Sequence, residues 1–235
     1  MGAIWKSYTQ YNFTKCDYVI SFAEANDMAV RAHNLVWVTE KESLLPAFVR
    51  NEQNATTLET RMLEYIDRVV SHVGERAFAW DVINEAVSDK SGEIIKPSPW
   101  SKIDDFVCKA FKAAHEANPK AQLFYNDYGA ESTAGWQSTK SDKVYNFLKD
   151  LINRGCPVHG VGLQSHITLK YDDDMLEGVR ENIRRLGELG LLVHITELDV
   201  KCSSEKPCTG SDWTEEMKEE QATIYEGLLK ICLEE

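Results

Sequence analysis

The stretch "WDVINEAV", residues 80–87, ends an apolar, β-branched run with an amide and a carboxylate, Asn84 and Glu85. A short run of this kind predicts a buried β-strand. A glutamate is unusual at the end of such a strand, because burying a carboxylate costs free energy unless the carboxylate has hydrogen-bond or charge partners. We therefore expect Glu85 to face a ligand at the end of the strand.

Four other apolar runs resemble this one, and helical segments alternate with them. The strand-like runs cover residues 28–37, 77–86, 121–129, 159–166 and 191–200. Apolar periodicity predicts helices over residues 15–26, 57–74, 102–117, 141–154, 174–189 and 213–233. Strict alternation of helices and nearly continuous apolar strands is typical of a parallel sheet covered by helices. Since no shift in composition marks a linker, the sequence predicts one domain over residues 1–235.

Polar side chains stand at the carboxyl end of each of the five predicted strands. In chain order they are His33 and Asn34, Asn84 and Glu85, Asn126 and Asp127, Gln164 and His166, and Glu197 and Asp199. Parallel α/β proteins build their sites at this edge. A ring of converging groups favours a (β/α)8 barrel, and an open doubly wound parallel sheet is the alternative. No glycine-rich phosphate-binding loop follows the first strand.

Composition and charge narrow the class of partner. The formal net charge of −12 argues against nucleic acid, because phosphate binding depends mainly on Lys and Arg. No apolar run approaches membrane-spanning length, and no protein partner or cofactor is implied. A metal site would need three or four converging acids or histidines, whereas these strand ends carry mostly amides. Amides and indoles suit a neutral sugar.

The two glutamates suggest a specific chemistry. Glu197 and Asp199 project from the same face of the last predicted strand, because strand side chains alternate. His166 is placed to bridge these carboxylates and to keep Glu197 ionised and oriented, as a nucleophile requires. Glu85 follows a strand rich in Trp, Val and Ile, a desolvating setting that suits a general acid. One protonated and one ionised carboxyl, about 5–5.5 Å apart, perform retaining glycoside hydrolysis.

Five motifs together resemble a known family. They are "RAHNLVW" (31–37), "WDVINEAV" (80–87), "LFYNDYG" (123–129), "GVGLQSH" (160–166) and "HITELDV" (194–200). In this order they resemble the endo-β-1,4-xylanases of glycoside hydrolase family ten. The resemblance implies a (β/α)8 barrel, a retaining double-displacement mechanism, xylan or a xylo-oligosaccharide as partner, and an extracellular location. The five predicted strands correspond to the third to the seventh of the family, so we expect a catalytic domain truncated at both ends.

The resemblance also implies roles for individual residues. Glu85 is expected to be the acid/base and Glu197 the nucleophile, with His166 as its hydrogen-bond partner and Asp199 behind it. The residues expected to bind substrate are His33, Trp37, Asn84, Asn126, Tyr128 and Gln164. The family usually has histidine after the motif tryptophan, where this chain has Val38. Two alternatives remain open: a weakly active or non-catalytic xylan-binding remnant, and a β-1,4-glucanase of a related barrel family.

The six cysteines allow a further prediction. Cys16, Cys108 and Cys232 lie in predicted helices and are interpreted as small buried hydrophobic residues, while Cys156 closes a helix–strand turn. Cys202 and Cys208 flank one loop, a spacing that favours a local disulfide; two free thiols are the alternative. A disulfide would indicate an oxidising compartment.

Overall fold

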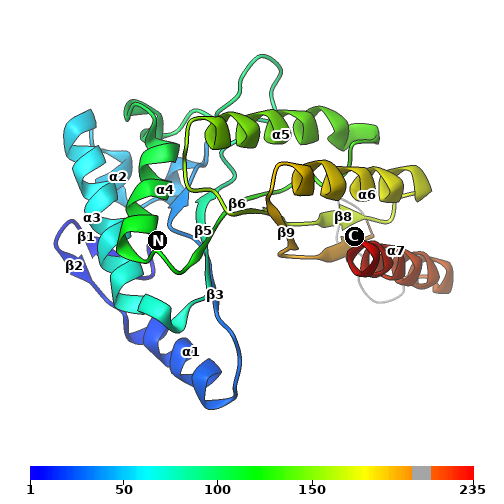
Figure 1. Ribbon diagram of the computed structural model, residues 1–235, viewed down its shortest axis with the longest axis horizontal. Coiled ribbons are helices and arrows are strands. Elements are labelled where there is room, and N and C mark those ends of the chain that lie inside the picture. The colour runs from blue at the N-terminus through cyan, green and yellow to red at the C-terminus, as the bar shows by residue number, and fades with distance from the viewer. Residues whose placement is uncertain (203–212) are drawn as a thin grey trace. The chain divides into compact units, whose positions relative to one another are not determined.

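The computed structural model describes residues 1–202 and 213–235, and its fold is α/β (Figure 1). The parallel strands follow one another in chain order, β3-β5-β6-β7-β9, with β4 also paired to β5. Their bounds are β3 Arg31–Ala32, β4 Val36–Trp37, β5 Ala79–Asn84, β6 Gln122–Asp127, β7 Gly160–Leu163 and β9 Leu192–Ile195. This arrangement confirms the α/β class and the five parallel strands that the sequence predicts.

All six predicted helices are present, with ends that differ by a few residues from the predictions. They are α1 Thr14–Ala25, α3 Ala55–Val73, α4 Phe106–Ala117, α5 Ser138–Asn153, α6 Asp173–Glu188 and α7 Glu215–Glu234. The sequence reading missed shorter elements, namely the hairpin of β1 Trp5–Ser7 and β2 Gln10–Tyr11, and the helix α2 Ala47–Arg50. Among the described residues, no helix is both long and apolar enough to cross a membrane.

The chain divides into two compact units. The first comprises residues 1–126 and 150–160, and the second comprises residues 127–149 and 161–235. One domain over residues 1–235 stays a prediction.

In the first unit, the core forms between the strands and two long helices. β5 is buried along its whole length, because it pairs with β3 and β4 on one side and with β6 on the other. α3 packs against α4, and α4 packs against β5. The buried residues of α3 recur at helical spacing: Leu58, Met62, Tyr65, Ile66, Val69, Val70 and Val73. The Asn54 side chain caps this helix by accepting a hydrogen bond from the Thr57 N–H at 2.9 Å.

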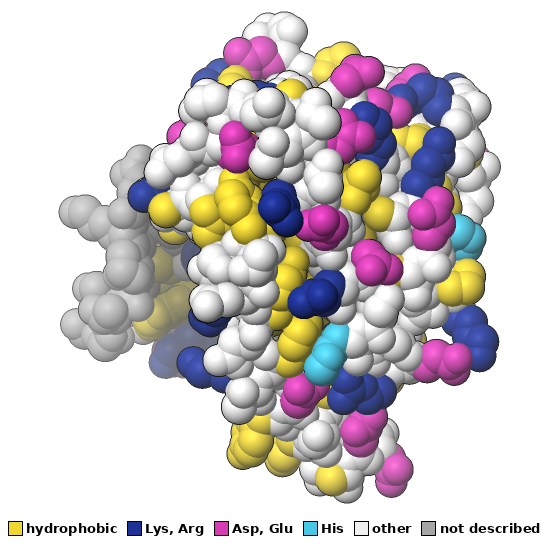
Figure 2. Space-filling view, turned by 90° about the vertical axis from the view of Figure 1, so that its left-hand side faces the viewer, with side chains coloured by type: hydrophobic (Ala, Val, Ile, Leu, Met, Phe, Trp, Pro, Cys, Tyr) yellow, Lys and Arg dark blue, Asp and Glu magenta, His cyan; other side chains and the backbone are white. Residues whose placement is uncertain are grey.

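The first unit also leaves apolar side chains in contact with solvent. Tyr18, Val19 and Phe22 of α1 are each more than half exposed. Figure 2 shows hydrophobic side chains between charged ones of both signs on one face of the molecule. Burial of apolar surface contributes about 25 cal/mol to stability for each Å². An element that covered Tyr18, Val19 and Phe22 would therefore stabilise the first unit.

In the second unit, two of the predicted strands are interrupted, which corrects the sequence reading. β7 ends at Leu163 and a separate strand, β8, spans His166–Thr168; similarly, β9 ends at Ile195 and β10 spans Asp199–Lys201. The physical reason lies partly at Ser165, whose φ of 62° turns the chain out of the extended conformation. β8 and β10 then pair in parallel with Asp199 opposite His166.

The helices α6 and α7 pack against each other and cover β8 and β10 of the second unit. Their shared core contains Ile167, Leu169, Tyr171, Met175, Val179, Val200, Ile224, Leu228 and Ile231. The cap of α6 is Asp172, whose side chain accepts a hydrogen bond from the Met175 N–H at 3.0 Å. This core holds the two short strands together at the residues predicted for the site.

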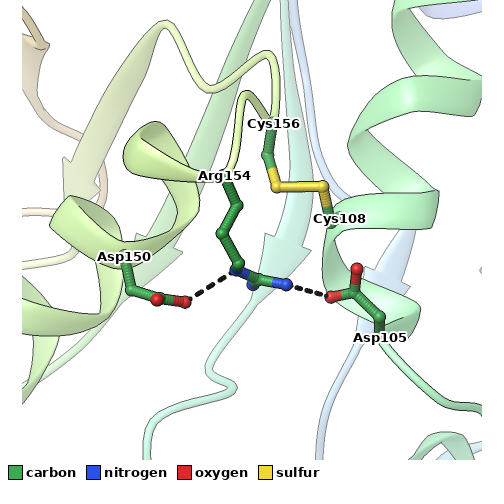
Figure 3. The surroundings of a disulfide bond; sticks show 5 residues. All are labelled: Asp105, Cys108, Asp150, Arg154 and Cys156. Carbon is green, nitrogen blue, oxygen red and sulfur yellow. Dashed lines mark hydrogen bonds and ion pairs between the residues drawn. A yellow bond between two sulfur atoms is a disulfide. The ribbon is translucent and has the colours of Figure 1, made fainter.

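A disulfide joins Cys108 of α4 to Cys156, which follows α5, and both belong to the first unit. Cys108 is buried, as predicted, but it is also bonded, because the chain turn after α5 brings Cys156 within bonding distance. The prediction that Cys232 is buried is wrong, since it is exposed on α7. Beside the bond, Arg154 lies between Asp105 and Asp150 and pairs with each at 2.8 Å (Figure 3). The predicted Cys202–Cys208 bond stays a prediction, since Cys208 lies outside the described residues.

Candidate active site

Glu85 lies directly after β5, where the backbone leaves the sheet. Its φ of 60° is uncommon for a residue other than glycine, and such conformations cluster at functional sites. The Glu85 N–H still donates to the carbonyl of Asn126 at 2.8 Å, so the end of β6 anchors this residue. The turn is therefore held in place by the neighbouring strand.

Three side chains of the first unit orient the Glu85 carboxylate. The indole N–H of Trp37 donates to its Oε2 at 2.9 Å, because β4 pairs with β5 in a register that sets Trp37 opposite Asn84. The amide of Asn84 donates to its Oε1 at 3.2 Å, and the Asn84 Oδ1 in turn accepts from the amide of Asn126 at 2.9 Å. Two predicted substrate-binding side chains, Trp37 and Asn84, thus also fix the predicted acid/base.

His33 is held by a carboxylate that the sequence reading did not single out. Its Nδ1 lies 3.0 Å from the Asp81 carboxylate, which is buried in β5 and forms an ion pair with Arg31. The Nε2 of His33 lies 3.2 Å from the amide nitrogen of Asn34. A carboxylate on one ring nitrogen fixes the tautomer of an imidazole. An acidic residue inside an otherwise apolar strand is the signal that could have identified Asp81.

In the second unit, His166 lies between Glu197 and Asp199. Its Nδ1 is 2.9 Å from Asp199 Oδ2, and its Nε2 is 3.2 Å from Glu197 Oε2. The predicted Asp–His–Glu chain is therefore present, although it arises from the β8–β10 pairing and not from one continuous strand. Glu197 sits in the break after β9, where its N–H donates to the carbonyl of Gln164 at 3.0 Å. About a third of each of the His166 and Glu197 side chains is exposed, so a ligand has access to both.

Tyr128 and Gln164 lie close to Asp127 in the same unit. The Lys140 ammonium lies 3.5 Å from the centroid of the Tyr128 ring and 3.0 Å from Asp127 Oδ1. That oxygen also accepts the Tyr128 N–H at 2.9 Å, while the Gln164 N–H donates to the Asp127 carbonyl at 2.9 Å. A cation over a tyrosine ring restrains that ring. The sequence reading missed Lys140, since a lysine in a helical stretch is usually solvent-exposed.

The predicted site residues fall into two groups. The first unit brings together His33, Trp37, Asn84, Glu85 and Asn126, whereas the second brings together Tyr128, Gln164, His166, Glu197 and Asp199. Glu85 and Glu197 belong to different units, and their separation of about 5–5.5 Å stays a prediction. Within residues 1–202 and 213–235, no cluster of three or more His, Cys, Asp or Glu side chains is arranged to hold a metal ion.

Parallel strands followed by carboxylates, amides and an Asp–His–Glu chain are typical of the class of α/β proteins whose sites are built at the carboxyl edge of the strands. The model of the glycosyl hydrolase family 10 matches residues 1–235, and the chain belongs to this family.

Individual relatives agree with the family match. The chain is 38% identical over 192 residues to a beta-1,4-xylanase of Dictyoglomus thermophilum, covering 81% of this chain and 51% of the relative. It is 32% identical to endo-1,4-beta-xylanase B of Paenibacillus barcinonensis, covering 96% of this chain and 67% of the relative. The chain therefore spans between half and two thirds of the length of these relatives.

Solved structures show the same relationship. Native xylanase 10B of Thermotoga maritima matches 99% of this chain with a TM-score of 0.87 and 37% identity, and the match covers 67% of that structure. Xylanase 10B of Thermotoga petrophila, solved in complex with xylobiose, matches with a TM-score of 0.85 and 36% identity. These matches confirm the predicted fold class and the prediction that the chain covers part of the family's barrel.

Proposed function

We propose that this chain carries the catalytic residues of a retaining endo-1,4-β-xylanase, which hydrolyses internal β-1,4 bonds of xylan. The observation that carries the proposal is the Asp199–His166–Glu197 chain at a parallel strand end in a member of glycosyl hydrolase family 10. The names of the relatives, which are xylanases, support the choice of substrate.

Glu197 is proposed as the nucleophile. An attacking carboxylate must be ionised and must point at the anomeric carbon of the sugar. His166 can donate a hydrogen bond to Glu197 Oε2, and Asp199 fixes the other ring nitrogen of His166. The second carboxylate oxygen of Glu197 can then attack, forming a glycosyl–enzyme ester as the bond to the leaving sugar breaks.

Glu85 is proposed as the acid/base. It gives its proton to the oxygen of the departing sugar in the first step. In the second step it removes a proton from water, which releases the sugar from Glu197. The Trp37 and Asn84 contacts support this role, because they hold the carboxyl in one orientation.

Six residues are proposed to bind the sugars. They are His33, Trp37, Asn84, Asn126, Tyr128 and Gln164. Their chemistry supports this, since imidazole, indole, phenol and amide groups can stack on pyranose rings and hydrogen-bond to hydroxyl groups. The xylobiose and xylotriose bound in two related structures support a xylo-oligosaccharide as the partner. An extracellular location is proposed with the function, and the Cys108–Cys156 disulfide supports it.

Two alternatives to this function are tested together with it. A non-catalytic or weakly active xylan-binding remnant is one alternative, since the chain spans about half of the Dictyoglomus relative and two thirds of the Paenibacillus one and its turnover of xylan is itself a proposal. A β-1,4-glucanase is the other alternative, since the acid pair by itself does not select the sugar.

One set of assays separates these proposals. Residues 1–235 and a version extended at both ends should be incubated with xylan and with carboxymethylcellulose, and the release of reducing sugar measured. The proposal expects hydrolysis of xylan and little of the cellulose derivative. Hydrolysis mainly of the cellulose derivative would favour the glucanase, and binding to xylan without turnover by either version would favour the remnant.

Single substitutions test the proposed roles. Glu197→Gln should abolish turnover, whereas Glu85→Gln should lose activity on xylan but still react with aryl xylosides that carry activated leaving groups. Glu116→Gln, which changes an exposed glutamate on α4, is the matched control and should be as active as the unchanged protein. Equal loss by Glu85→Gln on activated and unactivated substrates would argue against the acid role.

A further inference from the structure

Gln164 and Ser165 separate the end of β7 from His166, and Ser165 turns the chain. It is buried and adopts the left-handed conformation, with a φ of 62°, although it is not a glycine. The direction in which the chain enters β8 depends on this turn. The Ser165 N–H donates to Oε1 of Glu131 at 2.9 Å, so a side chain from another part of the sequence holds the turn.

Glu131 is 1% exposed and both of its carboxylate oxygens have donors. Oε1 also accepts the N–H of Gly129 at 3.1 Å, and Oε2 accepts a hydrogen bond from the Gln137 side-chain amide. The carboxylate therefore links the turn after β6 to the turn after β7. Burial raises the pKa of the Glu131 carboxyl, and the backbone N–H groups of Ser165, Glu131 and Gly129 act in the opposite direction.

Gln137 is itself fixed in one amide orientation. Its Oε1 accepts the Ser132 N–H at 3.0 Å and the phenol O–H of Tyr171 at 2.8 Å. Because that oxygen has two donors, the Gln137 amide nitrogen must face Glu131. All these side chains are buried, so solvent does not compete for their hydrogen bonds.

We propose that Glu131 is a positioning residue for the nucleophile, acting through the Ser165 turn on His166 and thereby on Glu197. This inference rests on the proposed function. His166 follows Ser165 directly, and its ring contacts both Glu197 and Asp199. Loss of the Glu131–Ser165 hydrogen bond rotates the peptide that precedes His166, and the ring moves relative to the two carboxylates.

The test uses a reciprocal exchange of acid and amide. In Glu131→Gln, the new N–H₂ group faces the N–H₂ group of Gln137, so two donors meet. Their repulsion displaces the new side chain and weakens its hydrogen bond to the Ser165 N–H. In the double variant Glu131→Gln/Gln137→Glu, the new amide donates to the new carboxylate, whose other oxygen accepts from Ser132 and Tyr171. The double variant thus restores a partner for every donor in the network.

The primary readout is the pair of imidazole ¹⁵N chemical shifts of His166 in residues 1–235, measured by NMR, which does not require turnover. We expect Glu131→Gln to change these shifts and the double variant to return them to those of the unchanged protein. Asn182→Ala is the matched control, because it removes hydrogen bonds to the Ala130 and Glu131 carbonyls of the same loop but leaves the Glu131 carboxylate in place. It should lower the melting temperature and leave the His166 shifts unchanged.

Unchanged His166 shifts in Glu131→Gln, no recovery in the double variant, or an equal change in Asn182→Ala would each overturn the proposal. If Glu131→Gln does not fold, Glu131→Asp takes its place, since the shorter side chain cannot reach Ser165 and Gln137 together; the same change in shifts is expected. Where the protein hydrolyses xylan, kcat should fall about 10-fold to 100-fold in Glu131→Gln with little change in KM, and recover in the double variant. Absence of xylan hydrolysis by the unchanged protein would contradict the proposed function alone, because the His166 spectrum still decides the role of Glu131.

Discussion

Removal of the Cys108–Cys156 disulfide is expected to destabilise the first unit strongly. The bond connects residues separated by 48 positions in the sequence, and both cysteines are buried. In the chain-entropy model, a closed loop of this length constrains the unfolded chain by about 4 kcal/mol at 25 °C. The nearby Arg154 ion pairs are substantially exposed and contribute only about 0–1 kcal/mol, so they do not replace the bond.

The double variant Cys108→Ala/Cys156→Ala should therefore lose about 4 kcal/mol of unfolding free energy, a large share of the roughly 5–15 kcal/mol typical of a domain. The assay is urea unfolding monitored by tryptophan fluorescence, in the absence of reductant. The slope of the free energy against urea should also rise, because the unfolded chain becomes less compact.

The control for this experiment is Cys16→Ala/Cys232→Ala, which removes the two cysteines that are free among the described residues. This control should unfold within about 0.5 kcal/mol of the unchanged protein, as surface substitutions usually do. If the Cys108→Ala/Cys156→Ala variant is also within about 1 kcal/mol of the unchanged protein, the loop-closure argument is wrong for this bond.

Two further predictions concern stability in each unit. Burial lowers the pKa of His159, whose Nδ1 accepts the Leu123 N–H at 3.0 Å. Because its pKa is lower in the folded protein, His159 takes up its proton at a higher pH in the unfolded chain. The free energy of unfolding is therefore highest above the ordinary histidine pKa of about 6.5 and decreases as the pH falls below that value. His159→Asn keeps an acceptor for that N–H, so its urea midpoint should vary less between about pH 7 and pH 5; an unchanged pH dependence would contradict this. In α6, a Cβ at Gly178 would lie 2.8 Å from the Ala134 backbone nitrogen, so Gly178→Ala should cost about 1–3 kcal/mol despite its better helix propensity. Gly187→Ala, in the same helix with open space around it, should instead be neutral or gain up to about 1 kcal/mol, and equal melting temperatures of the two variants would refute the packing argument.

Four residues of the candidate site could be predicted from the local sequence pattern. Glu85, His166, Glu197 and Asp199 were found from the sequence because each stands where an apolar, strand-like run ends. In a parallel sheet such ends lie at one edge, so the position along the chain implies a position in space. The Asp199–His166–Glu197 chain followed from this reasoning, although the strand proved to be interrupted.

The residues that support the site could not be found in the same way. Glu131, Lys140 and Asp81 were not singled out because charged residues are usually solvent-exposed, yet all three are buried. Their partners are distant in sequence, as with Glu131 and the Ser165 N–H, and a sequence pattern carries no information about such distances. A sequence signal exists where the charged residue stands inside an apolar run, as Asp81 does.

The sequence alone therefore determined the order and kind of the elements, because helical and strand periodicities are local properties of the chain. It also identified the polar residues that lie at or just after the ends of β5, β6, β7 and β9, although His166 and Asp199 begin the short strands β8 and β10. Only the tertiary structure decided that Cys108 bonds to Cys156, that Ser165 interrupts a strand and that Glu131 holds that interruption. Each of these features depends on the approach of two segments far apart in the chain, and such an approach is set by the packing of the whole unit.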